Sequence, residues 1–97
     1  MHTSVYIDIS IHTPDGPRRF ARFELGPDRD AARDLFKKLK GSPSVDHRDM
    51  LYIECMETVN GLPVNLDILT CNLQELGTNS MLITQEIFRV SNLTTRK

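Results

Sequence analysis

The sequence predicts an α+β fold: a two-layer sandwich of order ββαββα, with a four-stranded, mainly antiparallel sheet and two helices on one face. Three observations lead to this prediction. Four segments alternate apolar and polar residues, turn signals join these segments in two pairs, and an apolar pattern of helical period follows each pair. The same hairpin-helix order therefore occurs over about residues 3–40 and again over about residues 50–91. We find no convincing residue-by-residue identity between the two halves.

The first hairpin is predicted from alternation on both sides of a turn at residues 13–17, which contains Pro, Asp and Gly. A three-residue loop at residues 14–16 keeps one clean apolar face, whereas a two-residue turn at Asp15 and Gly16 would mix core and surface residues. The preferred register opposes three apolar pairs, which are Val5–Leu25, Ile7–Phe23 and Ile9–Ala21. It also sets Asp8 opposite Arg22 on the outer face, as an opposite-charge pair.

The first helix is predicted to begin at Pro27 and Asp28, because Pro suits the first helical turn and an acid is stabilised near the positive end of the helix. Spacings of i, i+3, i+4 and i+7 give it one apolar face, made by Ala32, Leu35, Phe36 and Leu39. Lysines crowd the last turn, and Gly41 is expected to cap the end. Residues 41–49 follow as a loop.

The second hairpin is predicted from Asn60 and Gly61, the strongest short signal for a two-residue turn with both residues at positive φ. Closing this turn on Val59 and Leu62 puts two apolar pairs on the core face, Cys55–Leu66 and Ile53–Ile68. The same register sets Glu54 directly opposite Asp67 on the outer face.

The second helix is predicted over about residues 72–91. Its core stripe follows spacings of 3, 4, 3, 4 and 3, over Leu73, Leu76, Ser80, Ile83, Ile87 and Val90. Asn72 followed by Glu75 resembles a capping box at its start, and Gly77 weakens it by about 1 kcal/mol relative to Ala. We expect one domain over residues 1–91 and a flexible tail at residues 92–97.

The composition is that of a soluble globular domain, since 39% of the residues are hydrophobic and 26% are charged. The net charge of −1 argues against non-specific nucleic-acid binding, which needs many basic contacts to phosphate. No apolar run is long enough to span a bilayer, and the first residues lack a signal-peptide pattern. Two cysteines without a CxxC motif indicate reduced thiols, so we expect a cytoplasmic protein.

The predicted pair of Glu54 and Asp67 is the feature that most indicates function. Directly opposed like charges are destabilising, and sequences tend to break local rules at functional sites. The same face is expected to present apolar side chains rimmed by charge, which is typical of a contact surface. The candidate binding residues are Tyr6, Phe20, Arg22, Tyr52, Glu54, Met56, Asp67 and Leu69. The alternative is a set of scattered exposed residues with both carboxylates solvated.

The second helix offers another candidate surface. At about 100° per residue, Met81 and Phe88 lie roughly opposite the stripe that contains Leu76, Ile83 and Ile87. A Met and a Phe one heptad apart on an outward face could pack on another copy of the chain. Isolated exposed apolar residues are also normal, which is the alternative interpretation.

No catalytic residue, cofactor or metal site is predicted. Two carboxylates without a third ligand fall short of a cage for a hard cation. Cys71 precedes a helix N-terminus, where a thiol pKa can fall, but no His is placed beside it, so an inert cysteine is favoured. His47 lies in a polar loop at residues 46–49 and has no identified nucleophile. Phosphate-binding and metalloprotease motifs are absent from the sequence.

The stretch METVNGLPVNL at residues 56–66, with the helix after it, resembles small uncharacterised bacterial proteins of roughly 100 residues with no assigned function. The resemblance implies a bacterial protein. It brings no activity, cofactor or catalytic residue to this sequence.

These observations favour a small interaction or binding module that self-associates as a homodimer or binds another protein. We expect no membrane partner and no nucleic-acid partner. The alternative is a small-molecule-binding protein or minor enzyme that uses an acidic cluster on the outer sheet face. A third possibility is an anion-contacting module, because residues 18–40 hold eight Lys or Arg against four Asp or Glu.

Overall fold

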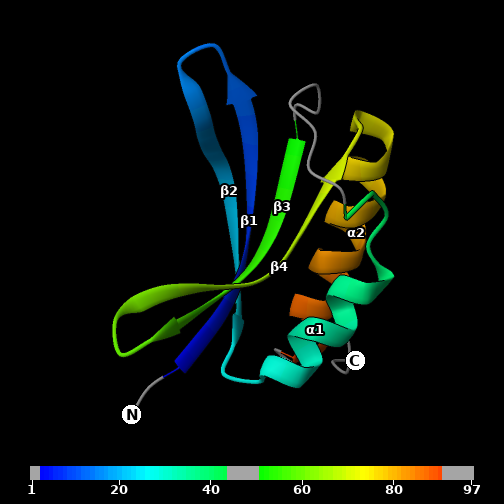
Figure 1. Cartoon of the computed structure of the whole chain (residues 1–97). Coiled ribbons are helices and arrows are strands. Elements are labelled where there is room, and N and C mark those ends of the chain that lie inside the picture. Colours follow the sequence, from blue (N-terminus) through cyan, green and yellow to red (C-terminus); the bar gives the residue numbers. More distant parts are fainter. Residues whose placement is uncertain (1–2, 44–50, 91–97) are drawn as a thin grey trace.

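A computed structural model of the chain contains four strands and two helices in the order ββαββα (Figure 1). It describes residues 3–43 and 51–90. The elements are β1 (Thr3–Thr13), β2 (Gly16–Gly26), α1 (Arg29–Lys38), β3 (Leu51–Val59), β4 (Leu62–Cys71) and α2 (Leu73–Val90). The predicted α+β class and element order are confirmed. The predictions for His47 in its loop and for a tail at residues 92–97 lie outside the described residues.

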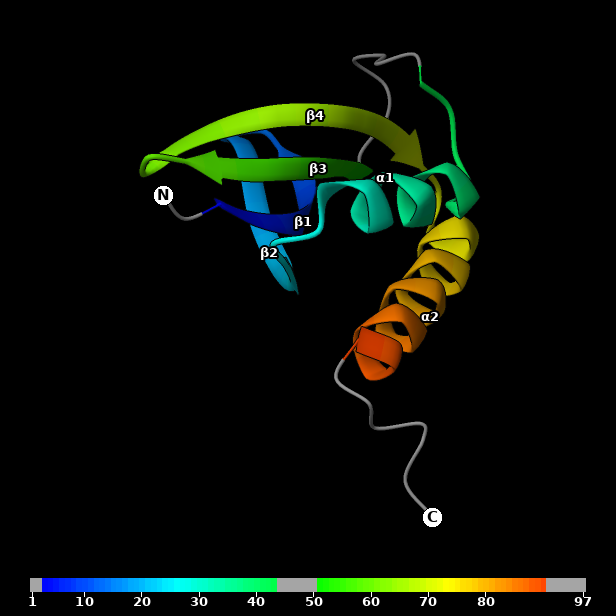
Figure 2. The ribbon, with the colours of Figure 1, turned by 90° about the horizontal axis from the view of Figure 1, so that it is seen from below.

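The strands form one antiparallel sheet in the order β2-β1-β3-β4. The first strand of each hairpin is therefore central, and the two hairpins join along β1 and β3. Figures 1 and 2 show that the sheet is strongly twisted and that both helices lie on the same side of it. The side without helices is called the outer face below.

The first hairpin keeps its predicted register at the centre. Asp8 pairs with Arg22, and the apolar pairs Ile7–Phe23 and Ile9–Ala21 form as expected. Nearer the start of β1, a register shift pairs Val5 with Gly26, so the predicted pair of Val5 with Leu25 is wrong. Leu25 is nevertheless buried in the core.

The turn of this hairpin differs from the prediction. Two residues, Pro14 and Asp15, replace the expected three-residue loop, and Gly16 follows them at a φ of 110° that glycine tolerates best. A bulge in β2, between the partners of Ile9 and Ser10, then adds the extra residue that the loop was expected to supply. The loop length was wrong, but the register beyond the bulge is the predicted one.

The second hairpin turns at Asn60 and Gly61, whose φ angles of 52° and 82° confirm the predicted turn. Val59 pairs with Leu62, also as predicted. Beyond this, a register shift between Cys55 and Met56 adds one residue to β4. The residues of β4 after the shift therefore face the side opposite to the predicted one, because side chains alternate along a strand.

The shift overturns three predicted pairs: Glu54–Asp67, Cys55–Leu66 and Ile53–Ile68. Instead Glu54 pairs with Ile68, Cys55 pairs with Asp67, and Ile53 pairs with Leu69. Leu69 is consequently buried in the core, at 7% exposure, and does not lie on the outer face. Asp67 also leaves the outer face, since its new partner belongs to the core side of β3.

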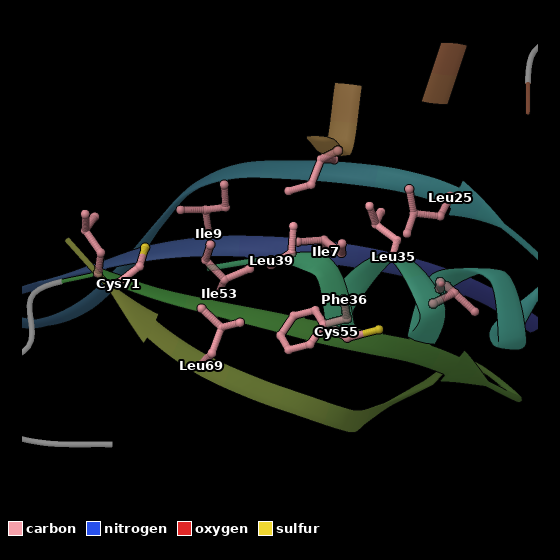
Figure 3. Packing of buried hydrophobic residues seen from close by; sticks show 14 residues of the cluster. Ile7, Ile9, Leu25, Leu35, Phe36, Leu39, Ile53, Cys55, Leu69 and Cys71 are labelled. Atoms are coloured by element: carbon pink, nitrogen blue, oxygen red, sulfur yellow. The ribbon is translucent and has the colours of Figure 1, made fainter. Parts of the chain in front are cut away.

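The core lies between the sheet and the helices, and Figure 3 shows its side chains from both layers. The predicted apolar face of α1 is confirmed, because Ala32, Leu35, Phe36 and Leu39 are all buried.

Asp28 caps α1 by accepting a hydrogen bond from the Ala31 N–H at 3.0 Å. In α2, Ile83 is fully buried and Leu76 and Ile87 pack against the core, whereas Leu73 is exposed.

The capping box predicted for α2 is confirmed. The Asn72 N–H donates to Glu75 Oε1 at 3.0 Å, and the Glu75 N–H donates to Asn72 Oδ1 at 2.8 Å. Two backbone donors at the helix start are therefore satisfied reciprocally, which favours α2 beginning at Leu73.

A fully buried amide joins α2 to the segment just after α1. Asn79 Oδ1 accepts from the Lys40 N–H at 2.6 Å, and Asn79 Nδ2 donates to the Lys40 carbonyl at 2.8 Å. Gly41 does not cap α1, whose C-cap is Leu39. The φ of Gly41 is 151°, and a Cβ at this residue would overlap the Thr70 carbonyl oxygen. The prediction that Gly41 caps α1 is therefore wrong, and the close approach of Thr70 is what requires glycine at this position.

Candidate functional site

The outer face holds five of the eight predicted binding residues. The strand registers place Tyr6, Arg22, Tyr52, Glu54 and Met56 on it. Asp67 and Leu69 are not among them, for the reason given above. Phe20 is the extra residue of the β2 bulge, and it is among the exposed large hydrophobic residues.

The centre of this face is an ion-pair cluster. Arg22 Nε donates to Asp8 Oδ1 at 2.8 Å, and a second guanidinium nitrogen donates to Oδ2 at 3.1 Å. The Arg22 guanidinium carbon lies 4.1 Å from the centre of the Tyr6 ring, which is only 5% exposed. The hydrogen bond to Asp8 is the main cause that raises the pKa of Arg22. Each charged and aromatic group of the cluster thus has an internal partner.

The neighbouring carboxylate is also held. Glu54 lies opposite Asp8 across β1 and β3, and its Oε2 accepts from Asn65 Nδ2 at 3.0 Å. The same amide nitrogen lies 3.4 Å from the sulfur of Met56. A ligand that binds Asp8, Arg22 or Glu54 would compete with these existing hydrogen bonds. The acidic cluster predicted from Glu54 and Asp67 does not form.

A second surface lies on the outward side of α2. Five residues at spacings of 3, 4, 3 and 4 form the outward stripe: Gln74, Gly77, Met81, Thr84 and Phe88. All five are exposed and uncharged, and Met81 and Phe88 are 54% and 44% exposed. The predicted exposure of Met81 and Phe88 is confirmed. The other three members of the stripe escaped sequence reasoning, although their heptad spacing was visible in it.

The two helices differ in what they present to solvent. Every exposed residue of α1 is charged: Arg29, Asp30, Arg33, Asp34, Lys37 and Lys38. Between Leu73 and Arg89, the exposed residues of α2 include one charged side chain, Arg89. A solvated helix normally resembles α1, with charge opposite its apolar face. The outward side of α2 therefore lacks the charge expected of a helix face that remains in water.

Gly77 has no evident purpose within the monomer. Glycine inside a helix costs about 1 kcal/mol relative to Ala. A Cβ added at Gly77 would meet no atom of the described chain within 4 Å, and the φ of Gly77 is not positive. Neither close packing nor backbone conformation within the described chain explains this residue.

The sequence reasoning missed a buried carboxylate at the start of α1. Glu57 is 3% exposed and pairs with Arg29, with contacts of 2.9 and 3.2 Å. The residues around this pair line a cavity of about 340 Å³. The parity of Ile53, Cys55 and Glu57 in one strand was the available signal, because it places Glu57 on the core side. Such a residue needs a cationic partner.

A larger cavity of about 380 Å³ lies where the start of α1 meets the end of α2. It is lined by Leu25, Pro27, Asp28, Ala31, Ala32, Glu86 and Arg89. Its two charged residues from α2 pair with each other, and the hydrogen bond from Arg89 lowers the pKa of Glu86. Glu86 and Arg89 thus neutralise each other within the cavity.

Both cysteines are free and buried. Burial raises the pKa of Cys55 to about 11 and also raises the pKa of Cys71. A raised pKa leaves little thiolate at neutral pH, which is the opposite of what a nucleophilic cysteine needs. The raised pKa of Cys71 supports its interpretation as an inert cysteine.

Metal sites need several ligating side chains close together, and membrane-spanning helices need about 20 apolar residues. Within residues 3–43 and 51–90, no group of three or more His, Cys, Asp or Glu is placed to hold a metal ion. No helix in the same part of the chain is both long and apolar enough to cross a membrane.

No family model matches the chain, and no curated protein or solved structure matches it significantly.

Proposed function

We propose that this chain is a small self-associating interaction module, and that the outward stripe of α2 is the surface through which two copies bind. The observation that carries the proposal is the contrast between the helices, since α1 presents only charged residues to solvent and α2 presents an uncharged stripe with exposed Met81 and Phe88. Interface centres are depleted in charge and enriched in aromatic residues and Met.

The size of the surface predicts weak to moderate binding. A helix of 18 residues is about 27 Å long, so a helix pair falls at the small end of specific interfaces. Burial of a Phe or Met side chain contributes about 1.5 to 3 kcal/mol, part of which offsets the entropy lost on association. We therefore expect a dimer that dissociates in the micromolar range.

The outer sheet face supports such a role less well. Its central groups, Asp8, Arg22 and Tyr6, contact one another, and Glu54 is held by Asn65. A partner would gain little from groups that are already paired.

We further propose that the module is cytoplasmic, a compartment in which two free buried thiols remain reduced.

Sedimentation equilibrium tests the proposal. The wild-type chain should change from monomer to dimer over roughly 1 to 500 µM. The double variant Met81→Glu/Phe88→Glu should stay monomeric over that range, because four carboxylates would meet in one interface. Leu62→Glu is the matched control, since Leu62 is 68% exposed but lies on the β3–β4 hairpin.

Three results would count against the proposal. They are a wild-type chain that stays monomeric throughout, a Leu62→Glu variant that dissociates as much as the stripe variant, and a dissociation constant that rises steeply with salt. The last would instead favour a charged contact surface, because salt screens ionic contacts and not apolar ones.

A further inference from the structure

We infer that the two copies of α2 pair antiparallel, with Phe88 of each chain seated over Gly77 of the other. This inference rests on the proposed self-association and adds the orientation and register of the partner. It starts from Gly77, an exposed helical glycine whose missing side chain leaves open space in the described monomer. A helix lacking a side chain at one point of an uncharged stripe offers a depression that a large partner side chain can fill.

The spacing of the stripe matches this arrangement in two places at once. In an antiparallel pair of helices, opposed residues have a constant sum of residue numbers. Placing Phe88 over Gly77 then opposes Met81 to Thr84, so each large side chain meets a smaller one. The two-fold axis repeats both contacts, giving the self-complementary interface expected of a closed dimer. Four complementary contacts thus follow from one choice of register.

A parallel pair fits less well. In register, it would oppose Phe88 to Phe88 and Gly77 to Gly77, which crowds one end of the stripe and leaves a void at the other. Packing that alternates large and small residues avoids both faults. The parallel arrangement would also bring Arg89 beside Arg89, whereas the antiparallel one brings it beside the first turn of the partner, which contains Glu75. Both size and charge favour the antiparallel pair.

Substitutions at Gly77 test the register. Gly77→Ala should raise the melting temperature of the monomer, because alanine favours the helix, and yet weaken dimerisation several-fold by filling the depression. Gly77→Phe should weaken dimerisation more, since two rings would compete for one position. Adding Phe88→Gly to Gly77→Phe should restore binding to near the wild-type value, because the ring and the depression have exchanged places.

A parallel dimer predicts the opposite sign. There Gly77→Phe would create a new aromatic pair and tighten the association. If Gly77→Phe or Gly77→Ala binds as tightly as the wild type or more tightly while the wild type dimerises, the antiparallel register is wrong and self-association stands. A wild-type chain that stays monomeric would instead remove the proposed function itself. Circular dichroism of each variant establishes that it is folded.

A distance measurement tests the orientation without altering the contacts at Gly77. A nitroxide on Gln74→Cys marks one end of the stripe, and the native thiols are buried with raised pKa values, so labelling is selective. Antiparallel helices should place the two labels about 25 Å apart or more, while parallel helices should bring them within about 15 Å. The shorter distance would overturn the inference.

Discussion

Asp8 on β1 and Glu54 on β3 lie directly opposite each other at the centre of the sheet, although both are carboxylates. Directly opposed like charges destabilise a sheet. The arrangement persists because Arg22 holds Asp8 from one side and Asn65 holds Glu54 from the other. The like-charge pair predicted from the sequence, Glu54 with Asp67, does not form. Glu54 instead lies opposite Asp8, where the two hairpins join.

Removal of Arg22 should therefore destabilise the fold through both carboxylates. We expect Arg22→Met to lower the free energy of unfolding, because it leaves Asp8 without the two hydrogen bonds that the guanidinium donates. Urea unfolding measures the change. Arg19→Met is the control, because Arg19 lies 3.9 Å from the same carboxylate and should matter little. Adding Asp8→Asn to Arg22→Met should recover part of the loss, and a strictly additive double variant would contradict the coupling.

The buried amide of Asn79 provides a second prediction. Asn79→Ala should lower the free energy of unfolding by about 2 to 4 kcal/mol, because it leaves the N–H and carbonyl of Lys40 without their hydrogen bonds. Chemical denaturation of the variant and of Ser80→Ala, its neighbour on the same helix, gives the comparison. Equal losses of unfolding free energy for the two substitutions would show that the hydrogen bonds to Lys40 do not stabilise the fold.

Removing Arg29 should destabilise the fold more than neutralising Glu57, its partner in the ion pair. Arg29→Met leaves a buried carboxylate without its cation, and we expect a loss of about 1 to 3 kcal/mol, limited by the exposure of Arg29. Glu57→Gln removes the buried charge and should cost less. Arg33→Met, an exposed position of the same helix, serves as the control in thermal unfolding. A larger loss for Glu57→Gln than for Arg29→Met would contradict this account.

Cys55 should make the fold sensitive to alkaline pH. Its pKa rises to about 11 in the folded protein from an ordinary value of 9.0. A raised pKa means that the folded state retains the proton longer, so this contribution is complete below about pH 9 and declines as the pH rises towards 11. The loss should be of the order of 2 kcal/mol.

Unfolding measured from pH 8 to about pH 11 in the wild type and in Cys55→Ala isolates this contribution, since other alkaline groups titrate in both proteins. The stability difference between the two proteins should shrink with rising pH. A constant difference would show that Cys55 ionises equally in the folded and unfolded chains.

Local chemistry made much of this fold predictable. The apolar face of α1, the Asn72–Glu75 capping box and the Asn60–Gly61 turn all depend on residues close together in the chain. The exposure of Met81 and Phe88 followed from the angle between successive helical residues. Each of these features is decided by the period of an element or by its ends.

The candidate site was predictable only in part. The outer-face residues Tyr6, Arg22, Tyr52, Glu54 and Met56 were placed correctly, because their strands alternate without interruption near them. Asp67 and Leu69 were misplaced by a single extra residue in β4. Nothing in the alternation of residues 64–68 marks that irregularity, since the apolar parity runs straight through it.

The sequence by itself determined which segments are strands and helices, where most of them begin and end, and which side of each helix is apolar. Only the tertiary structure decided the strand order, the bulges in β2 and β4 and the burial of Asn79. Helical periods, caps and tight turns depend on interactions between residues close in the chain, so the local sequence encodes them. Strand order and bulges depend on which distant surfaces fit together. That fit buries Leu69 in the core and leaves the outward stripe of α2 in solvent.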